Sequence, residues 1–133
     1  MSSIFSKIAK GEIPSYKVAE SEKYYAFLDI NPLVRGHVLV IPREAPDYFF
    51  DMSDDDLSGI MLFVKKIASA IKKSVPCRRV GMVVIGFDVP HAHIHLVPMQ
   101  DMQDINFNRA KLKLSMEEFQ SISESIAANM DLL

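Results

Sequence analysis

The sequence predicts an α+β domain built on an antiparallel sheet of about five strands, with one long helix packed on the sheet and short helices near the N- and C-termini. Three observations support this fold class. The predicted elements run in the order helix, three strands, helix, two strands, helix; the strands are short and β-branched; and two pairs of them are joined by short connections. A doubly wound parallel sheet would instead alternate strands with helices.

Length and composition fit one ordinary globular domain, which we expect to span residues 1–133. Apolar residues make up 49% of the chain and charged residues 24%, the balance typical of a protein with a single core. The net charge of -2 provides no basic field for a phosphate backbone. We therefore expect no nucleic-acid partner.

Cysteine usage and hydropathy predict a cytoplasmic protein. Cys77 is the single cysteine, so the chain has neither an internal disulfide nor a Cys-x-x-Cys pair for zinc. Lys7 and Lys10 interrupt the N-terminal apolar run before it could serve as the core of a signal peptide. No segment reaches the ~18 apolar residues of a membrane helix, so we expect no membrane partner.

The first third of the chain predicts a short helix followed by three strands. A helix over roughly residues 3–10 places its apolar side chains on one face, and Gly11 is positioned to end it in a left-handed cap. Residues 16–19 and 24–30 are rich in aromatic and β-branched side chains and are separated by a polar group, which predicts a hairpin. Residues 37–41 predict a third, buried strand that a proline ends.

The rest of the chain predicts two further helices and two further strands. Ser53 and Asp56 have capping-box spacing ahead of an apolar i, i+3, i+4, i+7 stripe, so a long helix should begin at Ser53 and end with lysines in its last turn. Residues 80–85 and 92–97 predict a second hairpin. Ser115 opens the same capping spacing ahead of a C-terminal helix.

The four histidines provide the main functional signal. His91, His93 and His95 occupy alternate positions of one predicted strand, and His37 begins another. Because side chains alternate across a strand, the three imidazoles should share one face. The apolar residues between and after them should then fill the opposite face against the core, namely Ala92, Ile94 and Leu96.

Three roles are open to this histidine cluster. A packing role is disfavoured, because burial opposes the imidazole charge and Val or Thr would pack better. A metal site is limited by geometry, since the Cα atoms of His91 and His95 lie ~13 Å apart along a strand, although two triad members with His37 could still hold an ion. We favour nucleophilic catalysis, in which a neutral imidazole attacks phosphorus and its neighbours orient it or protonate the leaving group. We expect no metal and no cofactor.

The run His91-Ala92-His93-Ile94-His95-Leu96-Val97 resembles the signature of the histidine-triad (HIT) family, in which histidines alternate with apolar residues. The chain looks closest to the Hint-like branch of nucleoside phosphoramidases and its bacterial relatives. The resemblance spans roughly residues 4–99 and includes three further segments in the family's order: Ile4-Phe5 with Ile13-Pro14, Phe27 to Pro32, and Gly36 to Pro42.

This resemblance implies a HIT-like homodimer that binds a purine nucleoside monophosphate moiety and cleaves the bond between its α-phosphorus and a leaving group. His93 matches the nucleophile, which becomes transiently nucleotidylated before water releases the nucleoside monophosphate. His95 would contact the phosphate, with His91 and His37 completing the network, and Asp29 would accept hydrogen bonds from the ribose. The other nucleotide-binding positions that the resemblance implies are Phe5, Ile13, Phe27, Ile30, Asp88 and Val89.

Structural roles remain open for several of these positions. The apolar side chains suit a flat purine but would serve equally well as ordinary core. Asp29 could act in turn chemistry, since it precedes Asn31-Pro32.

The loop before the triad departs from the family pattern. Members of the Hint-like branch usually carry Gly-Gln-Ser or Gly-Gln-Thr there and an Asn shortly upstream, whereas this chain has Gly86-Phe87-Asp88-Val89-Pro90. Phe87 cannot hydrogen-bond a phosphate, and an ionised Asp88 would repel one. We hypothesise that Asp88 pairs with a triad histidine or donates a proton.

The leading functional hypothesis is an enzyme that hydrolyses purine nucleoside phosphoramidates or related nucleoside monophosphate esters through a nucleotidyl-histidine intermediate. A dinucleoside polyphosphate hydrolase ranks second, because extra cations near the phosphates would favour it and we expect none around the triad. The alternative from another class is a nucleotide-binding protein with little turnover, which the altered loop at Phe87 and Asp88 suggests.

Overall fold

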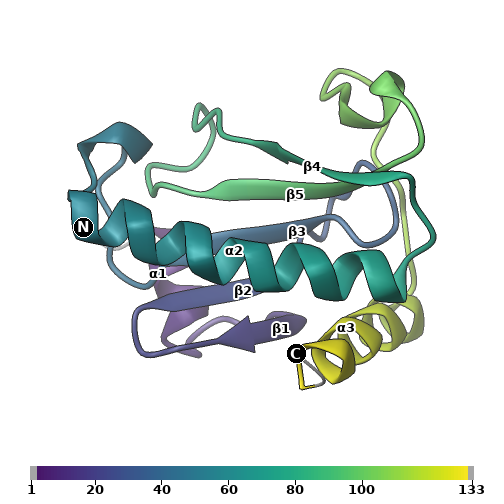
Figure 1. The fold of residues 1–133 in the computed structure, drawn as a ribbon, viewed down its shortest axis with the longest axis horizontal. Coiled ribbons are helices and arrows are strands. Elements are labelled where there is room, and N and C mark those ends of the chain that lie inside the picture. Colours follow the sequence, from purple (N-terminus) through teal and green to yellow (C-terminus); the bar gives the residue numbers. More distant parts are fainter. Residues whose placement is uncertain (1–2, 132–133) are drawn as a thin grey trace.

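The computed structural model describes residues 3–131, which form one antiparallel sheet with helices on both faces (Figure 1). The strands lie in the order β1-β2-β3-β5-β4, and each neighbouring pair is antiparallel. The predicted fold class, α+β with a five-stranded antiparallel sheet, is confirmed. The elements in chain order are α1 (Ile4–Ala9), β1 (Lys17–Glu20), β2 (Tyr24–Leu28), β3 (Val38–Pro42), η1 (Phe49–Asp51), α2 (Asp54–Ser74), β4 (Arg79–Val83), β5 (Ile94–Met99), η2 (Met102–Ile105) and α3 (Met116–Met130).

The long helix α2 crosses one face of the sheet and buries the larger core (Figure 1). Its N-cap is the predicted one, because the hydroxyl of Ser53 accepts a hydrogen bond from the backbone N–H of Asp56 at 3.1 Å. Acidic residues in its first turn and lysines in its last turn both suit the helix dipole. The apolar stripe of α2 is fully buried at Ile60, Ile67 and Ile71, where it packs against the sheet and α3.

The short helix α1 lies on the opposite face, behind the sheet in Figure 1, and covers a smaller core. Gly11 ends this helix at φ +80°, as the sequence predicted. The N–H of Gly11 donates to the carbonyl of Ile8 at 3.0 Å and that of Glu12 to the carbonyl of Lys7 at 2.9 Å, the two bonds of a Schellman motif. The smaller core consists of Phe5, Ile8, Ala9, Tyr25, Phe27, Leu39 and Ile41.

The strand order brings three segments that are distant in sequence to one place. β3 and β5 are neighbours, and Leu39 pairs with His95. His37 directly precedes β3, so it lies beside His95. Asp29 directly follows β2, which ends at Leu28, two residues before the predicted end, and the N–H of Asp29 donates to the carbonyl of His37 at 3.0 Å. The ends of β2 and β3 and the beginning of β5 therefore meet.

The second hairpin has a longer connection than predicted. β4 ends at Val83 instead of Ile85, and β5 begins at Ile94 instead of Ala92. The backbone N–H of Ala92 donates to the carbonyl of Pro46 at 2.8 Å, so this residue is held by a loop and not by a neighbouring strand. That tertiary contact is invisible in the hydrophobic pattern.

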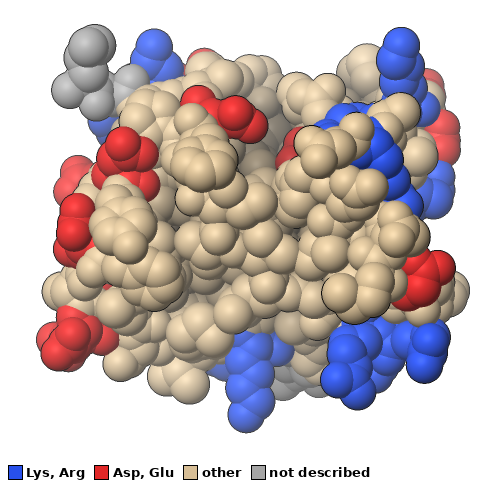
Figure 2. Space-filling view, turned by 90° about the horizontal axis from the view of Figure 1, so that it is seen from above, with Lys and Arg blue, Asp and Glu red and all other residues tan. Residues whose placement is uncertain are grey.

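β4 forms one edge of the sheet, and Figure 2 looks onto this side of the molecule, whose centre carries few charged side chains. Met82 on β4 is 49% exposed, and Ile85 and Phe87 in the following loop are 43% and 93% exposed. Among residues 3–131, no helix combines the length and the apolar character that crossing a bilayer would require.

Candidate active site

The four histidines gather on the α1 face of the sheet. Only His95 lies within a strand; His91 and His93 lie in the extended segment before β5, so the prediction of one strand containing all three is wrong. Their alternation nevertheless holds. The ring centroids of His93 and His95 are 5.1 Å apart, and Phe5 of α1 contacts the ring of His93 at 5.0 Å. The residues between and after them lie in the α2 core as predicted: Ala92, Ile94 and Leu96.

His93 has its tautomer fixed by the backbone. Its Nδ1 lies 2.7 Å from the carbonyl oxygen of His91, and because a carbonyl can only accept, Nδ1 must carry the proton. In the neutral ring, the lone pair is then on Nε2. The His93 side chain is also held from the side by Phe5 and is only 6% exposed. This arrangement suits a nucleophile, whose attacking atom must be unprotonated and oriented.

His37 and His95 form a directed hydrogen-bond chain. The backbone N–H of Leu33 donates to Nδ1 of His37 at 3.1 Å, so the proton of the neutral His37 ring is on Nε2. Nε2 of His37 lies 2.9 Å from Nδ1 of His95 and therefore donates to it. The remaining nitrogen of His95, Nε2, then carries a proton that can be donated to a phosphate oxygen.

His91 connects the triad to helix α1. Its Nε2 lies 2.7 Å from the carbonyl oxygen of Pro42 and must donate to it, which leaves Nδ1 as an acceptor. The hydroxyl of Ser3 lies 2.8 Å from this Nδ1 and donates to it. The same hydroxyl accepts from the N–H of Ser6 as the N-cap of α1. One serine thus caps the helix and orients His91.

Burial keeps three of the imidazoles neutral. Burial, together with the positive charges of His95 and Lys111, lowers the pKa of His37 to about 3. Burial and the charge of His93 lower the pKa of His95 to about 4. Burial also lowers the pKa of His91, although its hydrogen bond to the Pro42 carbonyl acts in the opposite direction. These rings are therefore hydrogen-bonding groups at neutral pH, and not cations.

Asp29 has both the turn role and a position facing the histidines. One carboxylate oxygen accepts from the N–H of Asn31 at 2.8 Å, an Asx turn. The other oxygen lies 3.7 Å from Nε2 of His37, whose proton is directed at His95 instead. Burial raises the pKa of Asp29, while the Asn31 bond and the charges of His93 and Lys111 lower it.

Of the apolar and loop positions predicted to bind nucleotide, four belong to the smaller core or pack against it, and Ile30 and Asp88 do not. Phe5 and Phe27 meet edge to face at 5.6 Å within the smaller core, and Ile13 and Val89 pack against that core. Ile30 is 64% exposed and lies outside both cores. Phe5 thus contacts His93 directly, whereas Phe27, Ile13 and Val89 belong to the same core as Phe5.

Asp88 does not pair with the triad. Its side chain is exposed, and within residues 3–131 it has no hydrogen bond or ion pair with any of the histidines. The hypothesised pair is therefore not formed in this structure, in which the Asp88 side chain is exposed, and the role of Asp88 as a proton donor stays a prediction.

Sequence analysis missed two residues of the C-terminal segment that reach the site. The ring centroid of Phe107 lies 4.9 Å from that of His95 and 6.3 Å from that of His37. The ammonium of Lys111 lies 5.9 Å from the centre of the Phe107 ring. Its charge adds to the effect of burial in lowering the pKa of His37 and opposes the burial that raises the pKa of Asp29. The expectation that the surroundings of the triad offer no extra cation is therefore wrong. No regular element carries Phe107 or Lys111, so no periodicity indicated them.

One cluster has the composition of a metal site. Side-chain ligand atoms of Asp29, His37 and His95 lie within 4.8 Å of one another. The hydrogen bond that His37 accepts does not fit a metal ligand, however. The Leu33 N–H occupies the lone pair on Nδ1 of His37, so Nε2 could bind a cation only by losing its proton. A ligating histidine ordinarily donates through its other nitrogen, and His37 accepts there instead.

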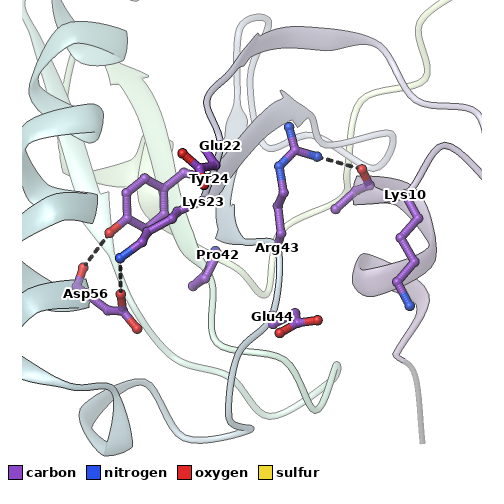
Figure 3. Close-up of a pocket in the computed structure, with 9 residues that line it drawn as sticks. Lys10, Glu22, Lys23, Tyr24, Pro42, Arg43, Glu44 and Asp56 are labelled. Carbon is purple, nitrogen blue, oxygen red and sulfur yellow. Dashed lines mark hydrogen bonds and ion pairs between the residues drawn. The ribbon is translucent and has the colours of Figure 1, made fainter.

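A hollow of about 680 Å³ is lined in part by Pro42, whose carbonyl accepts a hydrogen bond from His91 (Figure 3). It opens between the end of α1, the β1–β2 turn and the start of α2. Among its charged side chains, Lys23 lies 3.7 Å from Asp56, and Arg43 donates to the carbonyl of Ala9 at 2.8 Å. None of its lining residues is a histidine.

The fold and this group of interacting imidazoles define a histidine-triad protein of the α+β class. Residues 10–102 match the HIT domain model, and the chain belongs to the HIT family. The predicted membership of the HIT family is therefore confirmed.

Relatives and solved structures agree with this assignment. The chain is 35% identical over 133 residues to the adenosine 5'-monophosphoramidase of Schizosaccharomyces pombe, covering 98% of this chain and 99% of that protein. It is 37% identical over 135 residues to an uncharacterized HIT-like protein of Borreliella burgdorferi, covering 96% and 97%. A HIT-like protein from Bartonella henselae superimposes with a TM-score of 0.83 at 28% identity, covering 96% and 95% of the two chains.

Proposed function

We propose that this protein is a nucleotide hydrolase that cleaves the bond between the α-phosphorus of a purine nucleoside phosphoramidate and its leaving group. The observation that carries the proposal is the hydrogen bond from Nδ1 of His93 to the His91 carbonyl, which leaves the Nε2 lone pair available. The similarity to an adenosine 5'-monophosphoramidase supports this substrate class. The same similarity supports a related nucleoside monophosphate ester as the substrate less directly.

The proposed reaction has two displacements at phosphorus. The Nε2 lone pair of His93 forms a bond to the α-phosphorus, and the electron pair of the phosphorus–nitrogen bond leaves with the amine, which takes up a proton from solvent. Water then attacks the same phosphorus, the bond to Nε2 breaks, and the water proton is released. The His91 carbonyl stabilises the positive charge that the His93 ring carries while it is bonded to phosphorus.

The neighbouring groups have distinct proposed roles. His95 donates its Nε2 proton to a phosphate oxygen, and His37 fixes the tautomer of His95. Asp29 accepts hydrogen bonds from the ribose hydroxyls through the oxygen not used by Asn31. The base and the sugar lie against the apolar group beside His93, formed by Phe5, Phe27, Ile13 and Val89.

Replacing the nucleophile tests this function. His93→Ala should abolish hydrolysis of adenosine 5'-phosphoramidate while the circular dichroism spectrum stays native, because the imidazole lone pair is lost. Free imidazole added to this variant should restore part of the rate, since it can occupy the vacated space. A fully active His93→Ala protein would rule the proposal out.

Lys111 favours a second candidate, a dinucleoside polyphosphate hydrolase. A cation close to Asp29 and His37 suits the additional phosphates of such a substrate. The two candidates are separated by comparing kcat/KM for diadenosine polyphosphates with kcat/KM for adenosine 5'-phosphoramidate. Tight nucleotide binding with no turnover of either would instead indicate a binding protein.

We further propose that the protein is a homodimer. β4 is an edge strand of the described sheet, so no neighbouring strand pairs with the backbone groups on its outer side. The face of the molecule at this edge carries few charged side chains at its centre (Figure 2). Met82 and Ile85 are both exposed there. Light scattering after size-exclusion chromatography should give twice the chain mass of 15.0 kDa for the wild type and the monomer mass for Met82→Glu.

A further inference from the structure

The segment from Asn106 to Leu112, here called the wall, lies beside the pair His37 and His95. The proposed mechanism gives this segment no role. Phe107 is half-buried, and its ring meets His95 edge to face at 4.9 Å and 76°. It meets His37 at 6.3 Å and 83°. Phe107 therefore follows His93 and His95 as the next ring in a continuous series of contacts.

This wall is fixed to the loop that positions His37. The guanidinium of Arg109 donates to the carbonyl of Leu33 at 2.9 Å, and the N–H of Leu112 donates to the carbonyl of Pro32 at 2.9 Å. The N–H of the same Leu33 donates to His37. The position of Phe107 is thus coupled to the position of the histidine pair through one short loop.

Lys111 places a cation at this wall. Its ammonium lies 5.9 Å from the centre of the Phe107 ring and donates to the carbonyls of Phe107 and Arg109. An ammonium has three donors, so two backbone carbonyls leave one for a ligand. The charge also reaches into the site, because it adds to the effect of burial in lowering the pKa of His37 and opposes the burial that raises the pKa of Asp29.

The loop on the other side of the triad offers the opposite electrostatics. Phe87 is 93% exposed, and Asp88, also exposed, carries a carboxyl group. An anion next to the reacting phosphorus would therefore be repelled from this loop and attracted to Lys111.

We propose that Phe107 and Lys111 form the leaving-group subsite and that this subsite selects leaving groups carrying an anion, either a carboxylate or a further phosphate. The inference rests on the proposed function and names its substrate class more narrowly. Phe107 contacts His95, the proposed donor to the phosphate, and Lys111 lies against Phe107, so a leaving group that extends past His95 reaches both side chains. The apolar part of a leaving group packs on Phe107, and its anion pairs with Lys111.

Two matched substrates test the carboxylate arm. Adenosine 5'-phosphoramidates of phenylalanine and of phenethylamine share the aromatic ring and differ in one carboxylate. Lys111→Gln should lower kcat/KM for the phenylalanine compound at least about tenfold, as expected for one hydrogen bond to a charged group, and change kcat/KM for the phenethylamine compound less than about twofold. Lys113→Gln removes an exposed lysine of the same segment and should leave both unchanged. Equal losses on both substrates in Lys111→Gln would overturn the subsite.

A binding measurement tests the phosphate arm without relying on turnover. ADP carries a second phosphate where the leaving group would be, and AMP does not. Calorimetry should show that Lys111→Gln weakens ADP binding about fivefold or more while AMP binding stays within about twofold. An ADP to AMP affinity ratio that is the same in the wild type and in Lys111→Gln would reject the inference, even if hydrolysis were also absent. Absent hydrolysis with a changed ratio would reject only the proposed function.

Discussion

The two faces of the sheet use the same strands for opposite purposes. On the α2 face, Ile67 and Ile94 are fully buried in an apolar core. On the α1 face, His37 and His93 are almost as inaccessible, at 1% and 6% exposure. Both ring nitrogens of His37 and Nδ1 of His93 nevertheless have defined hydrogen-bond partners. Burial therefore stabilises the α2 face, whereas on the α1 face it keeps imidazoles neutral while hydrogen bonds fix their tautomers.

The largest effect should follow a cavity in the α2 core. Ile67→Ala should lower the free energy of unfolding by about 2–5 kcal/mol in urea titrations, because the side chain is fully buried. Leu62→Ala on the same helix, where the side chain is 67% exposed, should cost less than about 0.5 kcal/mol. The folded fraction of Ile67→Ala should keep normal kcat/KM; a large loss of activity per folded molecule would mean that the two faces are not separable.

On the α1 face, the matching change should affect activity more than stability. His37→Ala removes the donor that fixes the tautomer of His95, so kcat should fall on the order of 10²-fold. Stability should fall by about 1–3 kcal/mol, since the Leu33 N–H loses its buried partner. Steady-state kinetics and urea unfolding measure the two effects. An unchanged kcat would contradict the proposed role of His37 in fixing the tautomer of His95.

Acid should destabilise the fold through the α1 face. The folded-state pKa values of His37 and His95, about 3 and about 4, lie below the ordinary 6.5, so the unfolded chain binds more protons over that interval. Stability should fall as the pH decreases from about 6.5 towards 4, with a slope of about 1.4 kcal/mol per pH unit for each histidine. Asp29, whose pKa is raised, offsets part of this slope at its acidic end.

A variant identifies the source of this acid sensitivity. His95→Gln should reduce the slope by about one proton, as measured by urea unfolding across the pH series. A slope identical to that of the wild type would show that His95 is not the group that resists protonation.

The smallest effect tests the link between α1 and the triad. Ser3→Ala and Ser115→Ala each remove an N-cap hydroxyl and should each cost about 1 kcal/mol of stability. Only Ser3 also donates to His91, so Ser3→Ala alone should lower kcat, by about fivefold, and Ser3→Thr should restore it. Equal kcat in the two alanine variants would show that Ser3 is only a helix cap.

Local signals in the sequence were sufficient for the elements whose causes are local. Ser53 and Ser115 begin helices because each hydroxyl caps an N–H three residues later. The alternation of Ala92, Ile94 and Leu96 with the histidines correctly separated the two faces, even though the strand begins only at Ile94.

Long-range contacts explain what the sequence left out. The bond from Ser3 to His91 joins residues 88 positions apart, and no periodicity reports it. Phe107 and Lys111 were missed because their segment is held by single hydrogen bonds to Pro32 and Leu33, not by a strand or a helix. The tautomers likewise depend on backbone carbonyls that only the fold brings close.

The central claim is that Nε2 of His93 is the attacking atom. The wild-type protein should be mixed with adenosine 5'-phosphoramidate, quenched in alkali within milliseconds, and digested for mass spectrometry and phosphorus NMR of the labelled peptide. The account predicts one adenylyl group on His93, with the chemical shift of an Nε2-linked phosphoramidate. An adenylyl group on another histidine or on Nδ1 would contradict it.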